Sequence, residues 1–184
     1  MWANLFIFID MVILCNAFWK ILRNLHAIKC KLQFLRIHHR EQVFFIGRGL
    51  DSAVSYEGSL KLKEISYINS FAIAAGELKH GTIALMEPGT LVIALACQDF
   101  LYEKMVSNIQ EIKARGAYVL AVAKEGNEAI AAQSDKMVYI PECRDEIVPL
   151  ISVVPLQLFA YYVAKKRGCN IDKPKNLAKS VTVE

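Results

Sequence analysis

Charged side chains that could carry out carbonyl and proton-transfer chemistry gather in two places along the chain. Glu57, Lys61 and Glu64 stand four and three residues apart, the spacing that puts side chains on one face of an α-helix. Lys179 lies in a short polar tail that follows a Pro-Lys turn. An amine can attack a carbonyl carbon, and a carboxylate can move a carbon-bound proton. The alternative for the helical residues is a solvated ion-pair ladder with no chemical role.

Two glycine-bounded segments extend this set. Gly76-Glu-Leu-Lys-His-Gly81 predicts a loop that could direct an acid, an amine and an imidazole toward a cleft. His80 suits proton transfer because imidazole titrates near neutral pH, although a lone loop histidine is more often a plain surface residue. Gly47-Arg-Gly49 lacks a third glycine and a phosphate-binding lysine and serine, so it predicts a tight turn between a strand and a helix.

Short apolar runs alternate with amphipathic stretches from residue 43 onward. Because the strands are apolar throughout, the pattern predicts an α/β fold with a parallel sheet covered on both faces. We expect the first helix to be capped by Asp51 or Ser52. Strands are predicted at 43–46, 91–96, 117–123 and 137–140, and helices at 51–67, 100–115 and 147–167.

Three residues within the predicted helices carry structural expectations. Gly58 disfavours a helix by about 1 kcal/mol relative to alanine, which indicates a close approach there, most simply by packing. Pro149 is expected in the first turn of the last helix. Pro155 would bend that helix unless the segment before it is irregular.

We expect the first 41 residues to form a separate, unassigned leader that is apolar and basic, with a helix as one conformation open to it. Residues 5–19 are apolar but include Asp10, and an acid at the centre of a bilayer costs about 2.5–3.5 kcal/mol. We therefore expect no membrane attachment, although the basic residues that follow leave an anchor at anionic lipid open. Residues 1–40 carry a net charge of +5, whereas residues 41–184 hold 16 basic and 17 acidic residues. Near neutrality argues against a nucleic-acid partner.

The cysteines and histidines do not have metal-ligand spacing. The five cysteines are widely spaced without a Cys-x-x-Cys pair, so we expect reduced thiols, no metal and no cofactor. Reduced thiols are typical of a cytoplasmic protein, which is the location we expect.

Four motifs in order resemble the last sugar isomerase (SIS) domain of the glutamine:fructose-6-phosphate aminotransferase family, the glucosamine-6-phosphate synthases. The resemblance runs from about residue 43 to the last residue, which indicates an SIS domain over 42–184 with a terminal active-site segment, 174–184. The motifs are Glu57-Gly-Ser-Leu-Lys-Leu-Lys-Glu-Ile-Ser-Tyr-Ile68, Ala74-Ala-Gly-Glu-Leu-Lys-His-Gly81, Val154-Pro-Leu-Gln-Leu158 and Pro174-Lys-Asn-Leu-Ala-Lys-Ser-Val-Thr-Val-Glu184.

The resemblance implies a three-layer αβα fold and a reaction in which fructose 6-phosphate accepts ammonia and isomerises to glucosamine 6-phosphate. Lys179 matches the lysine that forms a Schiff base with the ketose, and Glu64 matches the base that moves a proton between C1 and C2. Lys61 matches a lysine that assists Glu64. His80 matches the ring-opening histidine, which the partner subunit of a homodimer supplies. 

Two positions in the tail match substrate-binding residues, and the chain departs from the family at one of them. Ala178 keeps the family's residue, whereas Lys175 stands where the family usually has arginine, and an ammonium does not reproduce a guanidinium's planar fork. Residue 2 is Trp2 rather than the family's glutaminase cysteine, and no Ser-x-Ser-Gly-Glu-Thr phosphate loop is present. We therefore expect an isomerase half-site that is inactive alone. The alternative is a non-catalytic sugar-phosphate-binding module.

Overall fold

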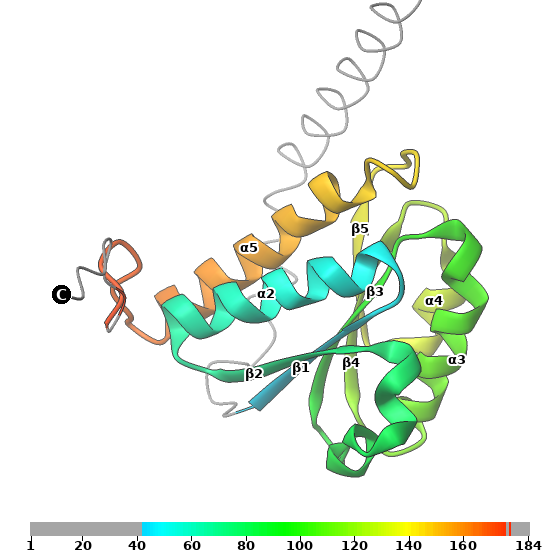
Figure 1. Ribbon diagram of the computed structural model, residues 1–184, viewed down its shortest axis with the longest axis horizontal. Helices are drawn as coiled ribbons and strands as arrows, with labels where there is room; N and C mark the ends of the chain where they lie inside the picture. Colours follow the sequence, from blue (N-terminus) through cyan, green and yellow to red (C-terminus); the bar gives the residue numbers. More distant parts are fainter. Residues whose placement is uncertain (1–41, 176, 178–184) are drawn as a thin grey trace, which may run out of the picture.

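The computed structural model describes residues 42–175 and residue 177, and a five-stranded parallel sheet lies at their centre. The strand order is β2-β1-β3-β4-β5, with helices on both faces (Figure 1). The strands are β1 (Gln42–Gly47), β2 (Asn69–Ala74), β3 (Leu91–Ala96), β4 (Tyr118–Lys124) and β5 (Lys136–Ile140). The helices are α2 (Leu50–Ser66), α3 (Tyr102–Lys113), α4 (Glu128–Gln133) and α5 (Val148–Lys166), with 3-10 turns η2 (Ala75–His80), η3 (Thr82–Leu85) and η4 (Asp99–Leu101).

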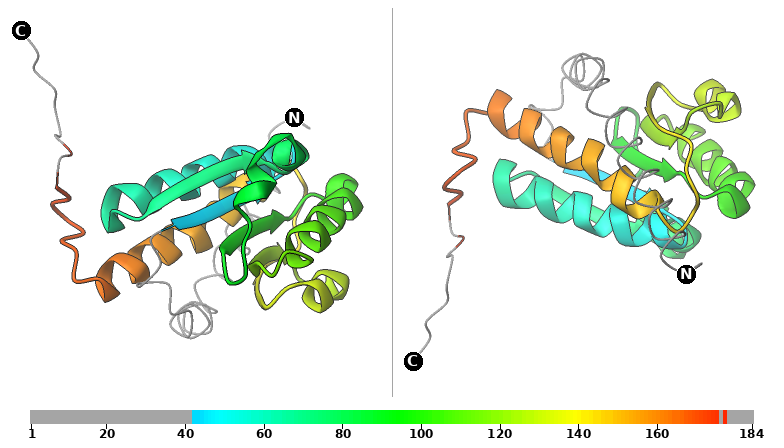
Figure 2. Two further views of the ribbon diagram at one scale, coloured as in Figure 1. Left: turned by 90° about the horizontal axis from the view of Figure 1, so that it is seen from below. Right: turned by 90° about the horizontal axis from the view of Figure 1, so that it is seen from above.

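The alternation of side chains along the strands builds two separate cores. In β1, Val43 and Phe45 pack into the core beneath α2 and α5, whereas Phe44 and Ile46 pack into the core on the α3 and α4 face. Both views in Figure 2 show α2 and α5 side by side on one face of the sheet, with α3 and α4 on the other. The predicted three-layer α/β class is therefore confirmed.

The sequence patterns located the central strands and long helices but missed β2. This strand has a polar start at Asn69 and exposed Phe71, because it forms one edge of the sheet. It also begins directly after the Tyr67 cap of α2 without a glycine or proline to mark the turn. Short α4 and the segment around His80, which is a 3-10 turn rather than a loop, were missed for the same lack of local signal.

The predicted cap of the first long helix is wrong. The helix begins at Leu50, Gly49 takes the N-cap position with φ 55°, and no side chain caps it. Asp51 lies inside the first turn, where its Oδ2 accepts a hydrogen bond of 2.8 Å from the backbone N–H of Cys97. A buried tertiary partner has thus replaced the local capping bond, and it ties the start of α2 to the end of β3.

Helix α5 is a core helix that runs through its second proline. Pro149 lies in the first turn, as expected, and Pro155 is buried within the continuous helix Val148–Lys166. Within the described part of the chain, this helix alone is long and apolar enough to cross a membrane, but half of its apolar stretch is buried inside the protein. It packs on α2 and the sheet, which accounts for its composition.

Gly58 confirms the expected close approach between α2 and α5. A β-carbon at this position would lie 2.6 Å from Cδ1 of Leu156 and 3.0 Å from the ring of Phe45. The described cysteines are unpaired thiols: Cys97 and Cys143 are buried, and Cys169 is half-buried.

Candidate functional site

The candidate acid and its neighbouring amine contact one another on the half-exposed face of α2. Nζ of Lys61 lies 2.6 Å from Oε2 of Glu64 and 3.8 Å from Oε1 of Glu57. The hydrogen bond that Lys61 donates to Glu64 raises the pKa of Lys61, so the amine stays charged. The contact with the ammonium of Lys61 holds the carboxylate of Glu64 in a fixed place on the helix.

This pair lies at the amino ends of the strands rather than at their carboxyl ends. Helix α2 starts at the carboxyl end of β1 and runs back along the sheet, so Glu64, 14 residues after Leu50, lies about 21 Å from the helix start. Ligands of open parallel sheets usually bind at the carboxyl ends, and the start of α2 does lie there. That rule therefore does not support a ligand-binding role for Glu64, because α2 runs back along the sheet and places Glu64 near the amino ends of the strands.

The C-terminal segment returns to the same end of α2. The backbone N–H of Lys175 donates a 2.6 Å hydrogen bond to the hydroxyl oxygen of Tyr67, and Nζ of Lys175 lies 6.0 Å from the centre of the tyrosine ring. Figure 1 shows this segment next to the end of α2. Tyr67 follows Glu64 by three residues, so the tail is attached close to the candidate acid.

Tyr67 has an unusual backbone that holds it at this place. It caps α2 in the left-handed conformation, with φ 59°, and its N–H donates to the carbonyl of Lys63 at 3.1 Å. Among the described residues it is the only non-glycine with positive φ. Such a conformation is uncommon for a bulky side chain and often marks a functional position. The ring also offers Lys175 a cation–π contact that an arginine could make as well.

Lys179 and Ala178 lie outside the described residues, so their positions stay a prediction. Lys179 follows Lys175 by four positions in the sequence, and a fully extended chain of that length spans at most about 14 Å.

His80 does not join this set within one chain. It is the last residue of η2, which follows the carboxyl end of β2, and its side chain is 75% exposed. Its Nε2 lies 3.9 Å from Oε2 of Glu77. Glu64 lies near the amino ends of the strands, so the two residues are at opposite ends of the sheet in the strand direction. The implied supply of His80 across a dimer interface stays a prediction that fits this separation.

A cavity of about 470 Å³ opens at the start of α2, beside the point between β1 and β3 where the strand order reverses, but the protein's own groups satisfy the helix amides there. The carbonyl oxygen Oε1 of Gln98 accepts a 2.8 Å hydrogen bond from the N–H of Leu50, and Asp51 and Ser52 donate their N–H groups to backbone oxygens of the preceding turn. The first amides of α2 are therefore satisfied. This turn does not offer the free amides with which a helix start binds phosphate.

Buried charges beside this point were missed by sequence reasoning. Lys124 ends β4 and is 1% exposed, with Nζ 2.8 Å from Asp145, 2.9 Å from Asp99 and 3.5 Å from Glu142. Burial lowers the pKa of this lysine, but the hydrogen bonds that it donates to Asp145 and Asp99 outweigh burial and raise the pKa. The sequence feature that could have indicated this buried charge is a lysine as the last residue of an otherwise apolar strand.

Burial raises the pKa of Asp51 to about 6, against the hydrogen bond from Cys97. Its second oxygen, Oδ1, has no hydrogen-bond partner among the described residues. Groups of three or more metal-ligating side chains are absent from the described part of the chain.

Comparison with protein families decides the family. The SIS domain model matches residues 36–166. The chain belongs to the SIS domain family. This SIS domain is 65% identical over 144 residues to a glutamine–fructose-6-phosphate aminotransferase of Caldanaerobacter subterraneus, covering 78% of the chain and 24% of that relative. It is 56% identical over 149 residues to the enzyme of the same description from Clostridium tetani, covering 81% of the chain and 24% of the relative.

Solved structures agree with this family. The C-terminal domain of the glucosamine-fructose-6-phosphate aminotransferase of Francisella tularensis superposes with a TM-score of 0.82 and 31% identity, over 90% of this chain and 46% of that chain. A glucosamine-6-phosphate deaminase from Thermotoga maritima gives a TM-score of 0.68 and 29% identity, over 84% and 44% of the two chains. The SIS domain spans about a quarter of the length of the curated relatives named above.

Proposed function

We propose that this SIS domain is the C-terminal isomerase half-site of a glutamine:fructose-6-phosphate aminotransferase. Its substrate is fructose 6-phosphate, and its product, once ammonia is supplied by another domain, is glucosamine 6-phosphate. The contact between Lys61 and Glu64, with the tail attached three residues away, is the observation that supports this function most. The 65% identity to an enzyme of that description supports the same substrate.

The chemistry assigns one role to each side chain. The Lys179 amine attacks the C2 carbonyl of the open-chain ketose and water leaves as the Schiff base forms. Ammonia then displaces the lysine at C2, and Glu64 carries a proton from C1 to C2, which gives the aldose with its amine at C2. Lys61 orients the carboxylate of Glu64 through their 2.6 Å contact.

The remaining groups bind the sugar or open its ring. His80 from the partner subunit of a homodimer exchanges a proton with the ring oxygen, since its exposed imidazole is free to reach another chain. Ala178 and Lys175 contact the sugar through the tail.

The half-site is incomplete by itself. The helix start that could bind phosphate is occupied by Gln98 and backbone oxygens, so the phosphate clamp belongs to a separate isomerase domain. We infer that the chain is inactive alone and acts in the cytoplasm, where its thiols stay reduced. The division between a leader, 1–41, and the SIS domain, 42–184, is part of the same proposal.

Reductive trapping tests the Schiff base. The purified full chain is incubated with fructose 6-phosphate and borohydride, alone and with the first isomerase domain of a curated relative. We expect a sugar adduct on Lys179 in the mixture, found by peptide mass spectrometry, and its loss in Lys179→Met. If Lys179 carries no adduct even with the added domain, the assigned role of the amine is wrong.

Substitution of Glu64 separates catalysis from the alternative of a non-catalytic binding module. Glu64→Gln keeps the size and the hydrogen-bonding oxygen but removes the base. A binding module would keep its affinity for fructose 6-phosphate and would have no proton exchange to lose. An isomerase half-site would lose exchange at C1 and C2 while retaining the trapped adduct on Lys179.

A further inference from the structure

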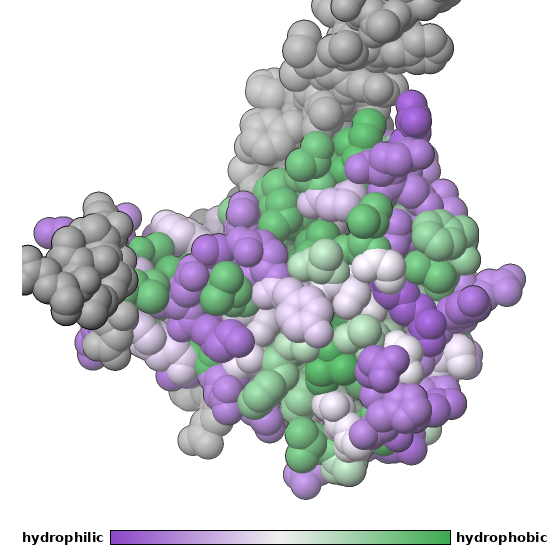
Figure 3. All heavy atoms as spheres, in the orientation of Figure 1, coloured by the Kyte–Doolittle hydropathy of each residue, from purple (hydrophilic) through white to green (hydrophobic). Residues whose placement is uncertain are grey.

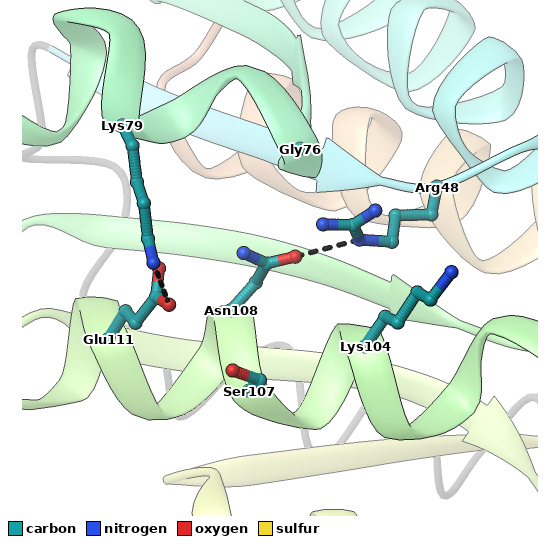
Figure 4. Close-up of a pocket in the computed structure, with 7 residues that line it drawn as sticks. All are labelled: Arg48, Gly76, Lys79, Lys104, Ser107, Asn108 and Glu111. Carbon is teal, nitrogen blue, oxygen red and sulfur yellow. Dashed lines mark hydrogen bonds and ion pairs between the residues drawn. The ribbon is translucent and has the colours of Figure 1, made fainter.

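A second, basic cavity opens on the α3 face at the carboxyl ends of β1 and β2. Its volume is about 230 Å³. Figure 4 shows Arg48 reaching in from the end of β1, Lys79 from η2, and Lys104 and Asn108 from α3. The lining residues are Arg48, Gly76, Lys79, Lys104, Ser107, Asn108 and Glu111.

The cations in this cavity outnumber the carboxylates. Glu111 is the one acid among the lining residues, and its carboxylate pairs with Nζ of Lys79 at 2.8 Å. Arg48 and Lys104 have no carboxylate partner within the described part of the chain. Two positive charges therefore face the same space without compensation, which is unfavourable unless an anion or solvent occupies it.

The guanidinium of Arg48 is held in a fixed orientation. Its Nε donates a 2.8 Å hydrogen bond to Oδ1 of Asn108, a residue that is 5% exposed. Gly76 lies across from the two Nη atoms, and a β-carbon there would sit 3.5 Å from each. The hydrogen bond at Nε fixes the plane of the Arg48 guanidinium. Because Gly76 has no side chain, the two Nη donors of Arg48 stay open to the cavity. A planar fork of this kind binds two oxygens of a phosphate at once.

We propose that this cavity binds a phosphate group, either as inorganic phosphate or as a phosphate monoester, at a site separate from Glu64. The open Nη donors of Arg48 and the ammonium of Lys104 would donate to the oxyanion, and Ser107 lines the same cavity. One water occupies about 30 Å³ of liquid, so a cavity of 230 Å³ holds a phosphate with a small polar substituent. The length of α2 separates the cavity from the Lys61–Glu64 pair, so the site goes beyond the proposed isomerase chemistry.

Titration of the isotope-labelled full chain followed by NMR tests this site, with inorganic phosphate and glycerol 3-phosphate as probes at constant ionic strength. We expect saturable shifts of backbone amides in η2 and α3. Tighter binding of glycerol 3-phosphate would assign the site to monoesters, and tighter binding of inorganic phosphate to the free ion. Absence of saturable shifts with both probes would overturn the proposal.

Matched variants separate a built site from general charge attraction. Lys104→Gln changes an exposed, unpaired residue and should raise the Kd about five-fold. Lys136→Gln removes the same charge from an exposed side chain at the start of β5, the strand at the other edge of the sheet, and should leave the Kd unchanged. Arg48→Lys keeps the charge but removes the fork, so it should weaken binding further. Equal effects of Lys104→Gln and Lys136→Gln would contradict the site.

Glu64→Gln keeps this test independent of the proposed function. The variant should bind phosphate with the wild-type Kd, because Glu64 lies at the other end of the strands. If Glu64→Gln abolishes the shifts, the phosphate occupies the isomerase site and the second site is refuted. If phosphate binds as expected but Lys179 is never trapped, only the isomerase function fails.

Discussion

Asp51 links the start of α2 to the end of β3 through a buried carboxylate, and burial makes ionisation of this group unfavourable. Its side chain is 2% exposed, it accepts one bond from Cys97, and its other oxygen has no described partner. Burial outweighs that bond and raises the pKa from 3.8 to about 6. The folded protein therefore holds the proton of Asp51 over a pH range in which the unfolded chain has released it.

The sign of the effect on stability follows from this difference. Between pH 3.8 and about 6 the folded state binds more protons than the unfolded state, so the contribution of Asp51 to stability falls as pH rises. The loss amounts to about 3 kcal/mol and is constant above pH 6. Asp51→Asn removes the titration. Unfolding by urea from pH 4 to 8 should show the variant gaining stability relative to wild type up to pH 6, then no further. A difference independent of pH would contradict the raised pKa.

Tyr67 should hold the tail through its hydroxyl group. Tyr67→Phe removes the acceptor of the Lys175 N–H but keeps the ring. A hydrogen bond contributes about 1 kcal/mol, so trypsin should cleave after Lys175 about five-fold faster in the variant, as measured by mass spectrometry. Tyr56→Phe is the control, because Tyr56 is 57% exposed on the same helix. Equal cleavage rates in the two variants would mean that Tyr67 does not hold the tail.

At the scale of elements, the layer made by α2 and α5 depends on a glycine at their crossing. A β-carbon on residue 58 would lie within 3.0 Å of Phe45 and 2.6 Å of Leu156. Gly58→Ala gains about 1 kcal/mol of helix propensity, but overpacking a core costs about 1–3 kcal/mol. We expect net destabilisation of about 1 kcal/mol, measured by urea unfolding.

The same site offers an internal check by double substitution. Leu156→Val shortens the side chain that the new methyl would meet, so Gly58→Ala should cost less in that background. Two neighbouring changes of this kind interact by about 0.5 kcal/mol or more. Stabilisation by Gly58→Ala in the wild-type background would show that the crossing is not tight.

The elements differ in how far the sequence could predict them. Strands β1, β3 and β4 are continuous apolar runs buried on both faces, so composition alone identifies them. Edge strand β2 mixes polar and exposed residues and owes its conformation to pairing with β1, which no local pattern reports. Asp51 shows the same limit, because its partner Cys97 is 46 residues away.

The candidate site also contains contacts that local spacing predicts and contacts that only the tertiary structure reveals. Lys61 and Glu64 are neighbours on a helix, so their 2.6 Å contact follows from spacing. The attachment of Lys175 to Tyr67 spans 108 residues and depends on how α5 returns to the end of α2. The basic cavity around Arg48 also draws on three separate elements, and sequence reasoning treated Gly47-Arg-Gly49 only as a turn.

At the scale of the molecule, Glu64 and His80 of one chain lie at opposite ends of the strands. Several large apolar side chains are also exposed to solvent. Leu150 is 60% exposed, Phe100 71% and Leu50 46%, near the start of α2 and α5. Figure 3 shows apolar surface over the α2 and α5 layer. Surface of this kind commonly lies within protein interfaces.

The proposed dimer predicts that two inactive variants restore one another. In a mixture of Glu64→Gln and His80→Ala subunits, a mixed dimer has one site with both Glu64 and the partner's histidine intact. Random pairing leaves about a quarter of the sites complete, so about a quarter of the activity should return when a first isomerase domain is present. Activity is measured as glucosamine 6-phosphate formed from fructose 6-phosphate and ammonia. Failure of the mixture to recover, with each variant folded and dimeric, would show that the histidine is not shared.

Deuterium exchange tests most directly whether the tail amine and the helical acid act on one sugar. Fructose 6-phosphate is incubated in deuterium oxide with the full chain and a first isomerase domain, and exchange at C1 is followed by NMR. We predict that the wild-type pair exchanges this proton and that Glu64→Gln and Lys179→Met each abolish exchange, while Lys136→Gln does not. Exchange that survives either substitution, or no exchange by the complete pair, would contradict the account.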